Sequence, residues 1–343
     1  MDGPAARIRE LSTFPVWVAP MAGGASMAAL VVAAVQAGAF GFLAGGYQQA
    51  DALAAEMDAV RGATAQPFGV NVFVPGEPAA DPGAVRSYIG SLRHEAARLR
   101  TEPGEPRWDD DSWAAKIALL LADPPAMVSF TFGCPPPGLV PEFRGRGTLV
   151  AITVTSPGEA RQAVAAGADC LILQGREAGA HSGTFTNAGR EDARTALLDL
   201  VARVAGMTGV PLVAAGGLAD AAGVAAALGA GATAAALGTA FLRCPESGAH
   251  PLHKAALADP RYTATAITRA FSGRPARALA NRFVADHADA PAGYPEINNA
   301  TRPLRAAAAA AGDADRMSLY AGEGFRAAAD RPAAEIIGRL TAR

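Results

Sequence analysis

The hydrophobic positions of the chain form short apolar runs that alternate with segments of helical length. The first run, at residues 16–19, is followed by Pro-Met-Ala-Gly-Gly and by an Ala/Val-rich segment through Gln36, for which Ser26 is the expected N-cap. Apolar runs at 40–43 and 68–72 then enclose a helical segment at 50–60. Strands and helices that alternate in this way predict a parallel β-sheet.

The alternation continues through the second half of the chain. Together with the three runs above, it gives eight strand-like runs, which predict a closed (β/α)8 TIM barrel rather than an open doubly wound sheet. The remaining apolar runs lie at residues 127–132, 149–153, 170–173, 212–215 and 233–237, and helices are expected to begin near Ser156, Thr195 and Asp220.

An internal repeat supports closure of the barrel. The segments 34–46, 163–175 and 227–239 align without gaps. Each contains the end of a helix, a glycine that can end it, an apolar run and a loop. The repeat therefore places the three loops at one face of the sheet, where the active sites of such barrels lie.

Two segments depart from the alternation. Residues from about 75 to 111 are rich in proline, glycine and charge and enclose one amphipathic helical segment at 84–100, so we expect an insertion after the third strand. Residues 1–248 would then form the barrel, and 249–343 a C-terminal extension. We expect this extension, with its last helix at 332–340, to form a helical cap over the barrel mouth.

Composition and charge narrow the class of protein. Half of the 343 residues are hydrophobic, and 30 basic residues against 32 acidic ones leave a net charge of −2 with no long run of one sign, so nucleic-acid binding is not expected. The chain shows neither a signal peptide nor an unbroken membrane span. Three scattered cysteines suit a reducing compartment, and we expect a cytoplasmic enzyme.

Glycines follow the last two predicted strands, a pair after the seventh and one after the eighth. Ala214-Ala-Gly-Gly and Leu237-Gly-Thr occupy the usual phosphate position of a barrel, and glycine lets backbone N–H groups face an anion. The same glycines could instead serve only tight turns. At the first strand, Pro20-Met-Ala-Gly-Gly offers a backbone surface suited to a flat ring. Asn71, at the end of the third strand, could bond a heterocycle or cap a turn.

His181 is the main candidate for catalysis. It is the only histidine in a glycine-rich loop after a buried strand, and its small neighbours offer little to bury it. Its near-neutral reference pKa suits a general base. His94 and His287 are expected to be solvated, and His250 with His253 lacks a third ligand, so no metal site is expected.

These motifs resemble the nitronate monooxygenases, formerly called 2-nitropropane dioxygenases. The similarity covers most of the chain, but Glu-Ala-Gly-x-His also occurs in FMN-dependent enoyl-ACP reductases and in some NADH:quinone reductases. The matching motifs are Pro20-Met-Ala-Gly-Gly, Gln174-Gly-Arg-Glu-Ala-Gly-Ala-His-Ser-Gly-Thr-Phe, Ala214-Ala-Gly-Gly, Leu237-Gly-Thr, Asn299-Ala-Thr-Arg-Pro and Tyr320-Ala-Gly-Glu-Gly-Phe-Arg.

The resemblance implies an FMN-containing barrel that oxidises alkyl nitronates with O2 to a carbonyl compound and nitrite, with propionate 3-nitronate as a candidate substrate. The alternatives are an FMN-dependent NAD(P)H:quinone or enoyl-ACP reductase and a flavin-binding module without turnover. Assembly into a homo-oligomer is left open. The resemblance makes His181 the catalytic residue and implies FMN contacts at Pro20, Met21, Ala22, Asn71, Gln174 and Gly179, with Gly217, Ala236, Leu237, Gly238 and Thr239 around the phosphate.

Three residues depart from the family pattern. Ala180 stands where many relatives have glycine, and Tyr320 stands where tryptophan is frequent. Glu323 stands where glutamine is frequent, and it could add negative charge near the barrel mouth. These departures bear on which substrate the enzyme prefers.

Overall fold

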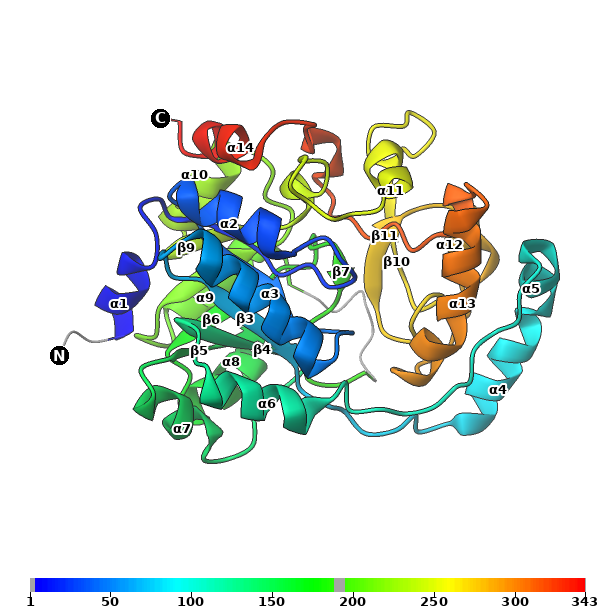
Figure 1. The fold of residues 1–343 in the computed structure, drawn as a ribbon, viewed down its shortest axis with the longest axis horizontal. Helices are drawn as coiled ribbons and strands as arrows, with labels where there is room; N and C mark the ends of the chain where they lie inside the picture. Colours follow the sequence, from blue (N-terminus) through cyan, green and yellow to red (C-terminus); the bar gives the residue numbers. More distant parts are fainter. Residues whose placement is uncertain (1–3, 188–194, 343) are drawn as a thin grey trace.

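The strands of the computed structural model, which describes residues 4–187 and 195–342, close into a barrel (Figure 1). Neighbouring strands are parallel, and the last pairs with the first. The predicted (β/α)8 barrel is therefore confirmed. In barrel order the strands are β1 (Val16–Val18), β2 (Phe40–Ala44), β3 (Gly69–Phe73), β4 (Met127–Thr131), β5 (Leu149–Val154), β6 (Cys170–Gln174), β8 (Leu212–Ala215) and β9 (Ala234–Leu237).

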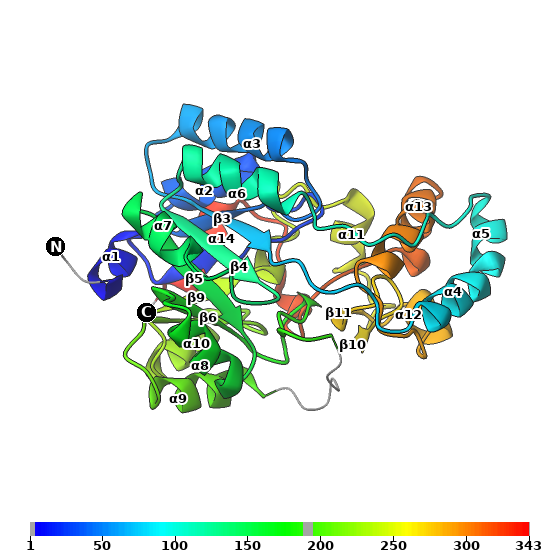
Figure 2. The ribbon, with the colours of Figure 1, turned by 90° about the horizontal axis from the view of Figure 1, so that it is seen from below.

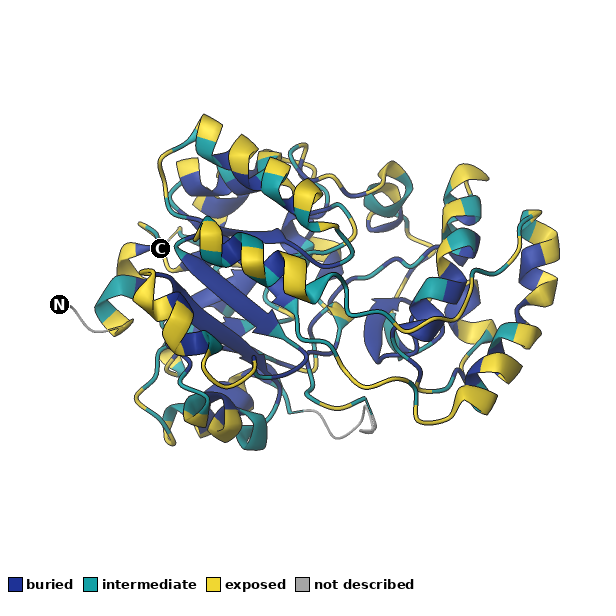
Figure 3. Ribbon diagram, turned by 60° about the horizontal axis from the view of Figure 1, so that its bottom comes forward, coloured by how far each residue is buried: buried dark blue, intermediate teal, exposed yellow. Residues whose placement is uncertain are grey.

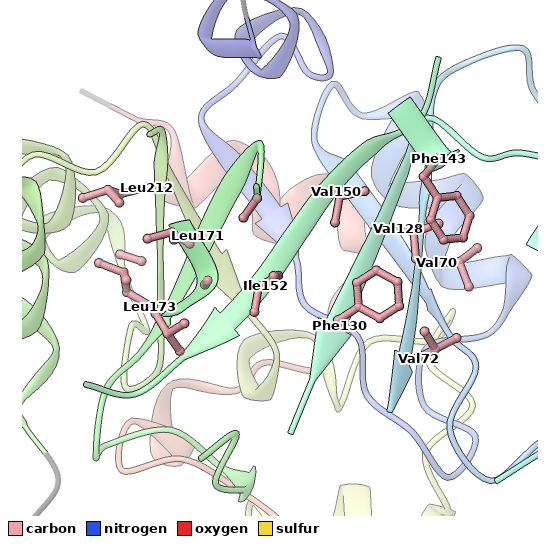
Figure 4. Packing of buried hydrophobic residues seen from close by; sticks show 14 of the residues in the cluster. Val70, Val72, Val128, Phe130, Phe143, Val150, Ile152, Leu171, Leu173 and Leu212 are labelled. Carbon is pink, nitrogen blue, oxygen red and sulfur yellow. The ribbon is translucent and has the colours of Figure 1, made fainter. Parts of the chain in front are cut away.

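Helices cover the outside of this barrel. The strands are buried and the helices expose only their outer faces (Figure 3). Alternate strand residues pack outward, and Figure 4 shows Val128 and Phe130 of β4 beside Phe143 in this layer. None of the helices in residues 4–187 and 195–342 is long and apolar enough to cross a membrane. The covering helices are α2 (Ala28–Gln36), α3 (Ala50–Ala63), α6 (Trp113–Ala122), α7 (Leu139–Gly145), α8 (Pro157–Ala165), α9 (Leu197–Ala205) and α10 (Ala221–Gly229).

The inward strand residues form a second apolar layer. Trp17, Phe40 and Phe42 pack together inside the barrel, with ring centroids 5.0 to 5.8 Å apart. Ile8 of α1 (Pro4–Glu10) joins this layer. The barrel interior is therefore a packed core rather than a pore, and a ligand can bind only beyond its end.

Of the helix starts predicted at Ser26, Ser156 and Asp220, two have the expected residue as N-cap, and the third does not. Ser156 and Asp220 cap α8 and α10 as expected, each accepting a hydrogen bond from the backbone N–H three residues on. Ser26 does not cap α2, which has Met27 as its N-cap. The Ser26 hydroxyl instead accepts from the N–H of Met21 and donates to the carbonyl of Ala19. This serine therefore shapes the loop after β1.

The segment between β3 and α6 leaves the barrel and forms two helices, α4 (Pro82–Ser91) and α5 (Arg93–Leu99). The single helical segment expected at 84–100 is interrupted at Leu92, the C-cap of α4. Leu92 is buried, and its side chain shares a core with α12 (Arg282–Asp286) and α13 (Glu296–Ala310). Because the helix is interrupted, both α4 and α5 can pack against α12 and α13. These four helices lie together beside the barrel in Figure 2.

The C-terminal extension is joined to the barrel through a small sheet. In this sheet β10 (Thr265–Thr268) pairs with β11 (Ala276–Leu279), and β11 pairs with the two-residue strand β7 (Ala180–His181). The strand β7 belongs to the loop after β6. The extension therefore holds the histidine loop directly through backbone hydrogen bonds.

The final helix, α14 (Ala333–Leu340), lies on the outer wall of the barrel. It packs against α2 and α10, and its Ile337 joins a core with Leu30 and Val224. The prediction that residues 332–340 lie over the mouth was wrong. Only the short η2 (Thr239–Phe241) follows β9 directly, so α14 takes the place of the eighth barrel helix and covers the apolar surface there.

Candidate active site

A cavity of about 490 Å³ opens beyond the carboxyl ends of the barrel strands. Its wall comes from the loops after the strands and from the C-terminal extension. Every residue that the sequence marked for catalysis or cofactor binding lines it: Pro20, Met21, Ala22, Asn71, Gln174, Gly179, His181, Gly217, Ala236, Leu237, Gly238 and Thr239.

The loop after β1 presents backbone and small side chains to the cavity. The Ser26 hydroxyl ties the N–H of Met21 back at 3.0 Å. The loop after β9 lies close to this loop: a Cβ atom added at Gly238 would lie only 3.3 Å from the Met21 sulfur. This close approach leaves a low wall on which a planar group could lie.

Asn71 and Gln174 are polar residues at the upper end of the barrel interior. Asn71 is 3% exposed, and its Nδ2 donates to the hydroxyls of Ser129 and Thr131 at 2.9 Å. Gln174 bridges the histidine loop: its Nε2 donates to the carbonyl of His181, and its Oε1 accepts from the N–H of Gly183. Both amides are therefore fixed in orientation by their neighbours.

The loops after β8 and β9 form a glycine cradle. Gly216 and Gly217 have φ values of +113° and +71°, and a Cβ on Gly217 would lie 2.6 Å from Cβ of Glu177. Only glycine fits this backbone and this space. The N–H of Gly322 donates to the Thr239 hydroxyl at 3.0 Å, so the extension closes the cradle from above.

His181 is positioned by the small sheet and by one hydroxyl. On β7 it is paired with Ala276, and its Nε2 lies 2.8 Å from the Oγ of Ser272. Ser272 is buried, and its hydroxyl also contacts the backbone of Arg274. The residue before the histidine, Ala180, has a φ of +61°, which explains why glycine is frequent there.

The surroundings of His181 hold its ring in the neutral form. Phe132, Tyr294 and Tyr320 enclose the ring at centroid distances of 6.2, 5.7 and 5.2 Å, while one side opens to the cavity. Burial lowers the pKa of His181 to about 3, and the charges of Arg274 and Arg305 lower it in the same direction. The ring can therefore accept a proton or a hydrogen bond at neutral pH.

Several wall residues were not identified from the sequence. Tyr47 and Phe132 line the cavity with φ values of +65° and +80°, a conformation that costs roughly 1–2 kcal/mol for such residues. Arg274 stacks on Phe132 with its Cζ 3.8 Å from the ring centroid. Its Nε donates to the carbonyl of Ser182, and burial lowers its pKa to about 10. The arginine thus supports the histidine loop from behind the cavity wall.

The structure shows the surroundings of Tyr320 and Glu323, two of the residues that depart from the family pattern. Tyr320 lines the cavity beside His181. Glu323 forms an ion pair with the nearly buried Arg277 at 3.0 Å. Its negative charge is therefore compensated by a partner instead of adding to the field at the mouth.

The other histidines differ in their surroundings. His94 is exposed, as expected. His287 is half-buried against Phe283 and Tyr88, so the expectation that it is solvated was wrong; the insertion helix α4 covers it. His253 lines the cavity, and burial lowers its pKa to about 4. Across the described ranges, no group of three or more His, Cys, Asp or Glu side chains could hold a metal ion.

Known proteins resemble this chain over nearly its whole length. A model of the nitronate monooxygenase family matches residues 6–343. A nitronate monooxygenase of Pseudomonas aeruginosa is 39% identical over 337 residues, which are 95% of this chain and 95% of that protein. A probable nitronate monooxygenase of Bacillus subtilis is 35% identical over 318 residues, which are 92% of this chain and 91% of that protein.

Solved structures agree with this assignment. A nitroalkane oxidase from Streptomyces ansochromogenes superimposes with a TM-score of 0.95 and 48% identity, covering 97% of this chain and 96% of that one. FabK from Thermotoga maritima has a TM-score of 0.71 and 27% identity, covering 97% of this chain and 94% of that one. The chain belongs to the nitronate monooxygenase family and is an oxidoreductase of that family.

Proposed function

We propose that the protein is an FMN-dependent enzyme that oxidises alkyl nitronates with O2 to a carbonyl compound and nitrite, with propionate 3-nitronate as a candidate substrate. The proposal depends mainly on one arrangement: His181 and the glycine cradle of Gly216 and Gly217 line the same cavity. Burial lowers the pKa of His181, so that its ring is neutral. The family to which the chain belongs supports it.

The cavity wall fits FMN at both ends of the cofactor. Gly217, Gly238 and Thr239 would hold the phosphate, together with Ala236 and Leu237, because glycine backbone and a hydroxyl line the cavity there and glycine lets N–H groups approach an anion. Bound FMN would supply the electron transfer and the reaction with O2. The low wall of Pro20, Met21 and Ala22 would lie against the flavin ring, with Asn71, Gln174 and Gly179 near its polar edge.

His181 would meet the substrate. A nitronate is already an anion and needs no base, so the ring tautomer with its proton on Nδ1 would orient it by donating a hydrogen bond, while Nε2 accepts from the Ser272 hydroxyl. A neutral nitroalkane would have to lose its α-proton, and the ring can take it up. If the Ser272 hydroxyl donates to the carbonyl of Arg274, its oxygen accepts from Nε2–H, and Nδ1 is left as the proton acceptor.

The rings around His181 would keep water away from the reacting carbon. Phe132, Tyr294 and Tyr320 contact the histidine on three sides, and Tyr47 adds a hydroxyl 3.2 Å from that of Tyr294. Tyr47, Phe132 and Tyr320, which line the cavity, would give the substrate an apolar channel.

The visible spectrum of the purified protein tests cofactor and reaction together. We expect a flavin spectrum, FMN in the supernatant after denaturation, and bleaching when a nitronate is added without O2. Readmitting O2 should restore the colour and release nitrite. Bleaching by NADPH but not by nitronate would favour the reductase alternative, which the likeness to FabK keeps in view. A flavin that no donor bleaches would indicate a binding module.

A further inference from the structure

Asp111, the last residue of the acidic run at 109–111, contacts two groups of the barrel at once. Its carboxylate forms an ion pair with Nζ of Lys116 at 2.8 Å, and its Oδ1 accepts a hydrogen bond from the backbone N–H of Tyr47 at 2.9 Å. Lys116 lies on α6 and is only 1% exposed. Burial raises the pKa of Asp111, while Lys116 and the N–H of Tyr47 favour its charged form. A charged acceptor makes a stronger hydrogen bond than a neutral one, so Asp111 is a firm anchor for the loop after β2.

Tyr47 needs such an anchor because its backbone is left-handed, with a φ of +65°. A tyrosine persists in this conformation only where its surroundings hold it there. Asp111 and Ser112 are left-handed as well, each with a φ of +56°, and the Ser112 hydroxyl donates to Oε1 of Gln49 at 2.9 Å. The two left-handed segments therefore hold each other through one bond to the backbone and one between side chains.

The acidic run is also tied to the C-terminal extension. Asp109 accepts a hydrogen bond from Nδ2 of Asn299 on α13 at 2.7 Å, and its Oδ1 accepts from the N–H of Asp111 at 3.1 Å. Tyr294 lies just before α13, and its hydroxyl donates to that of Tyr47 at 3.2 Å. The extension thus meets the loop after β2 at two hydroxyls, and the acidic run joins the same two parts a second time.

Tyr47 stands between the active-site cavity and a second cavity of about 250 Å³. Tyr47 and Phe73 line both cavities, with ring centroids 5.5 Å apart. Asp111 and Tyr294 line the second cavity, and the ring of Tyr294 also contacts His181. If Tyr47 left its position, the two spaces would join, and water would reach the rings around His181.

We propose that Asp111 is a positioning residue that holds Tyr47 in the active-site wall, so that the substrate meets a closed and preformed cavity. Asp111 lines the second cavity rather than the active-site cavity, and it acts through Tyr47. Without its acceptor, the loop after β2 would leave the left-handed conformation for part of the time. The substrate would then bind only the fraction that is still in place, which raises KM in proportion and leaves kcat at saturation unchanged. This inference rests on the proposed oxidation of nitronates.

The test removes the acceptor at position 111 without leaving a buried charge. Asp111→Ala/Lys116→Met lacks both the charges and the acceptor. The matched control, Asp111→Asn/Lys116→Met, lacks only the charges, because an amide oxygen can still accept from the N–H of Tyr47. With ethyl nitronate, KM should be roughly 3- to 10-fold higher in the alanine form than in the asparagine form, at similar kcat.

A second comparison shows whether the effect passes through Tyr47. In a Tyr47→Gly background, KM of the alanine and asparagine forms should differ by less than about threefold, because glycine adopts a φ of +65° freely and has no ring to place. A general effect of position 111 on the fold would persist in that background. The two backgrounds therefore separate positioning from stability.

Acetylation of Tyr47 by N-acetylimidazole reports the position of its side chain without turnover. The reagent acetylates accessible phenols, and mass spectrometry of the peptides locates the acetyl group. Tyr47 should be acetylated at least about threefold faster in the alanine form than in the asparagine form. If wild-type protein releases no nitrite from ethyl nitronate, the proposed reaction fails, and the acetylation rates alone decide the positioning role.

Three results would overturn the inference. KM could differ by less than about threefold between the alanine and asparagine forms. A larger difference could persist in the Tyr47→Gly background. Acetylation of Tyr47 could differ by less than about threefold between the two forms. If Asp111→Ala/Lys116→Met does not fold, Gln49→Ala takes its place, since it removes the bond to Ser112 and keeps the buried charges paired. Gln49→Ala should raise KM at least about twofold over wild type, and a smaller rise would decide against the positioning role.

Discussion

The neutral state of His181 has a measurable consequence for the pH dependence of nitroalkane oxidation. Burial, with Arg274 and Arg305, lowers the pKa of the ring from 6.5 to about 3. At pH 5 a ring with a pKa of 3 is roughly 1% protonated, whereas an unperturbed ring would be about 97% protonated. For a neutral nitroalkane such as nitroethane, kcat/KM should therefore change little between pH 7 and pH 5. An unperturbed base would lose about 25-fold.

The assay is O2 consumption with nitroethane from pH 5 to pH 7, with His181→Asn measured beside wild type. Loss of the base should cost about 10²- to 10⁴-fold in kcat/KM with nitroethane. With ethyl nitronate, which has no proton to lose, the cost should be below tenfold. A wild-type decline of tenfold or more towards pH 5 that is absent with the nitronate would refute the desolvated ring. Equal losses with both substrates would refute the role of His181 as a base.

The same shift predicts how stability depends on pH. The unfolded chain binds a proton at His181 below pH 6.5, and the folded chain binds it only near pH 3, so this contribution is fully present above pH 6.5 and is lost as the pH falls. Between pH 8 and pH 5, His181 should account for about 2 kcal/mol of lost stability. His181→Asn should abolish that part of the change in urea denaturation, and an unaltered pH dependence would count against it.

Four further substitutions, at three positions, test the cofactor cradle, the histidine loop and the barrel wall. Gly217→Ala should abolish FMN retention, measured by absorbance, because its Cβ would meet Glu177 at a φ of +71°. Ala180→Gly should leave the melting temperature almost unchanged, since relief at a φ of +61° offsets the added chain entropy, whereas Ala180→Val should lower it. Ile337→Ala should cost about 2–5 kcal/mol in urea denaturation if α14 seals the barrel wall, and a loss below 1 kcal/mol would contradict that placement.

The sequence was most informative where local rules decide the structure. Strand and helix alternate by hydrophobic period, and the repeat glycines Gly38, Gly167 and Gly231 all have positive φ after a helix, as a C-cap requires. The cofactor candidates follow strands directly, so the barrel brought them together. Residue order along the chain was enough to place them.

The sequence was least informative where distant segments meet. The pairing of β7 with β11 joins His181 to Ala276, and no local pattern in the tail predicts this partner. Ser26 has the residue type of an N-cap, but hydrogen bonds to the loop after β1 compete for its hydroxyl. The helix α14 has an amphipathic pattern that says only that one face is buried, not which surface covers it.

The barrel and the C-terminal extension contribute to different parts of the site: the barrel supplies the candidate cofactor contacts, and the extension supplies most groups around His181. The candidate cofactor contacts lie in the C-terminal halves of β3, β6 and β9 and in the loops after β1, β6, β8 and β9, which the barrel itself fixes. Of the groups that surround His181, Ser272, Tyr294 and Tyr320 come from the C-terminal extension, and Phe132 comes from the loop after β4. The extension packs on α4 and α5 through its own core. Substitutions of Tyr294 or Tyr320 can therefore change which substrate is preferred while the barrel strands stay as they are, whereas Gly322 of the same extension also closes the cofactor cradle.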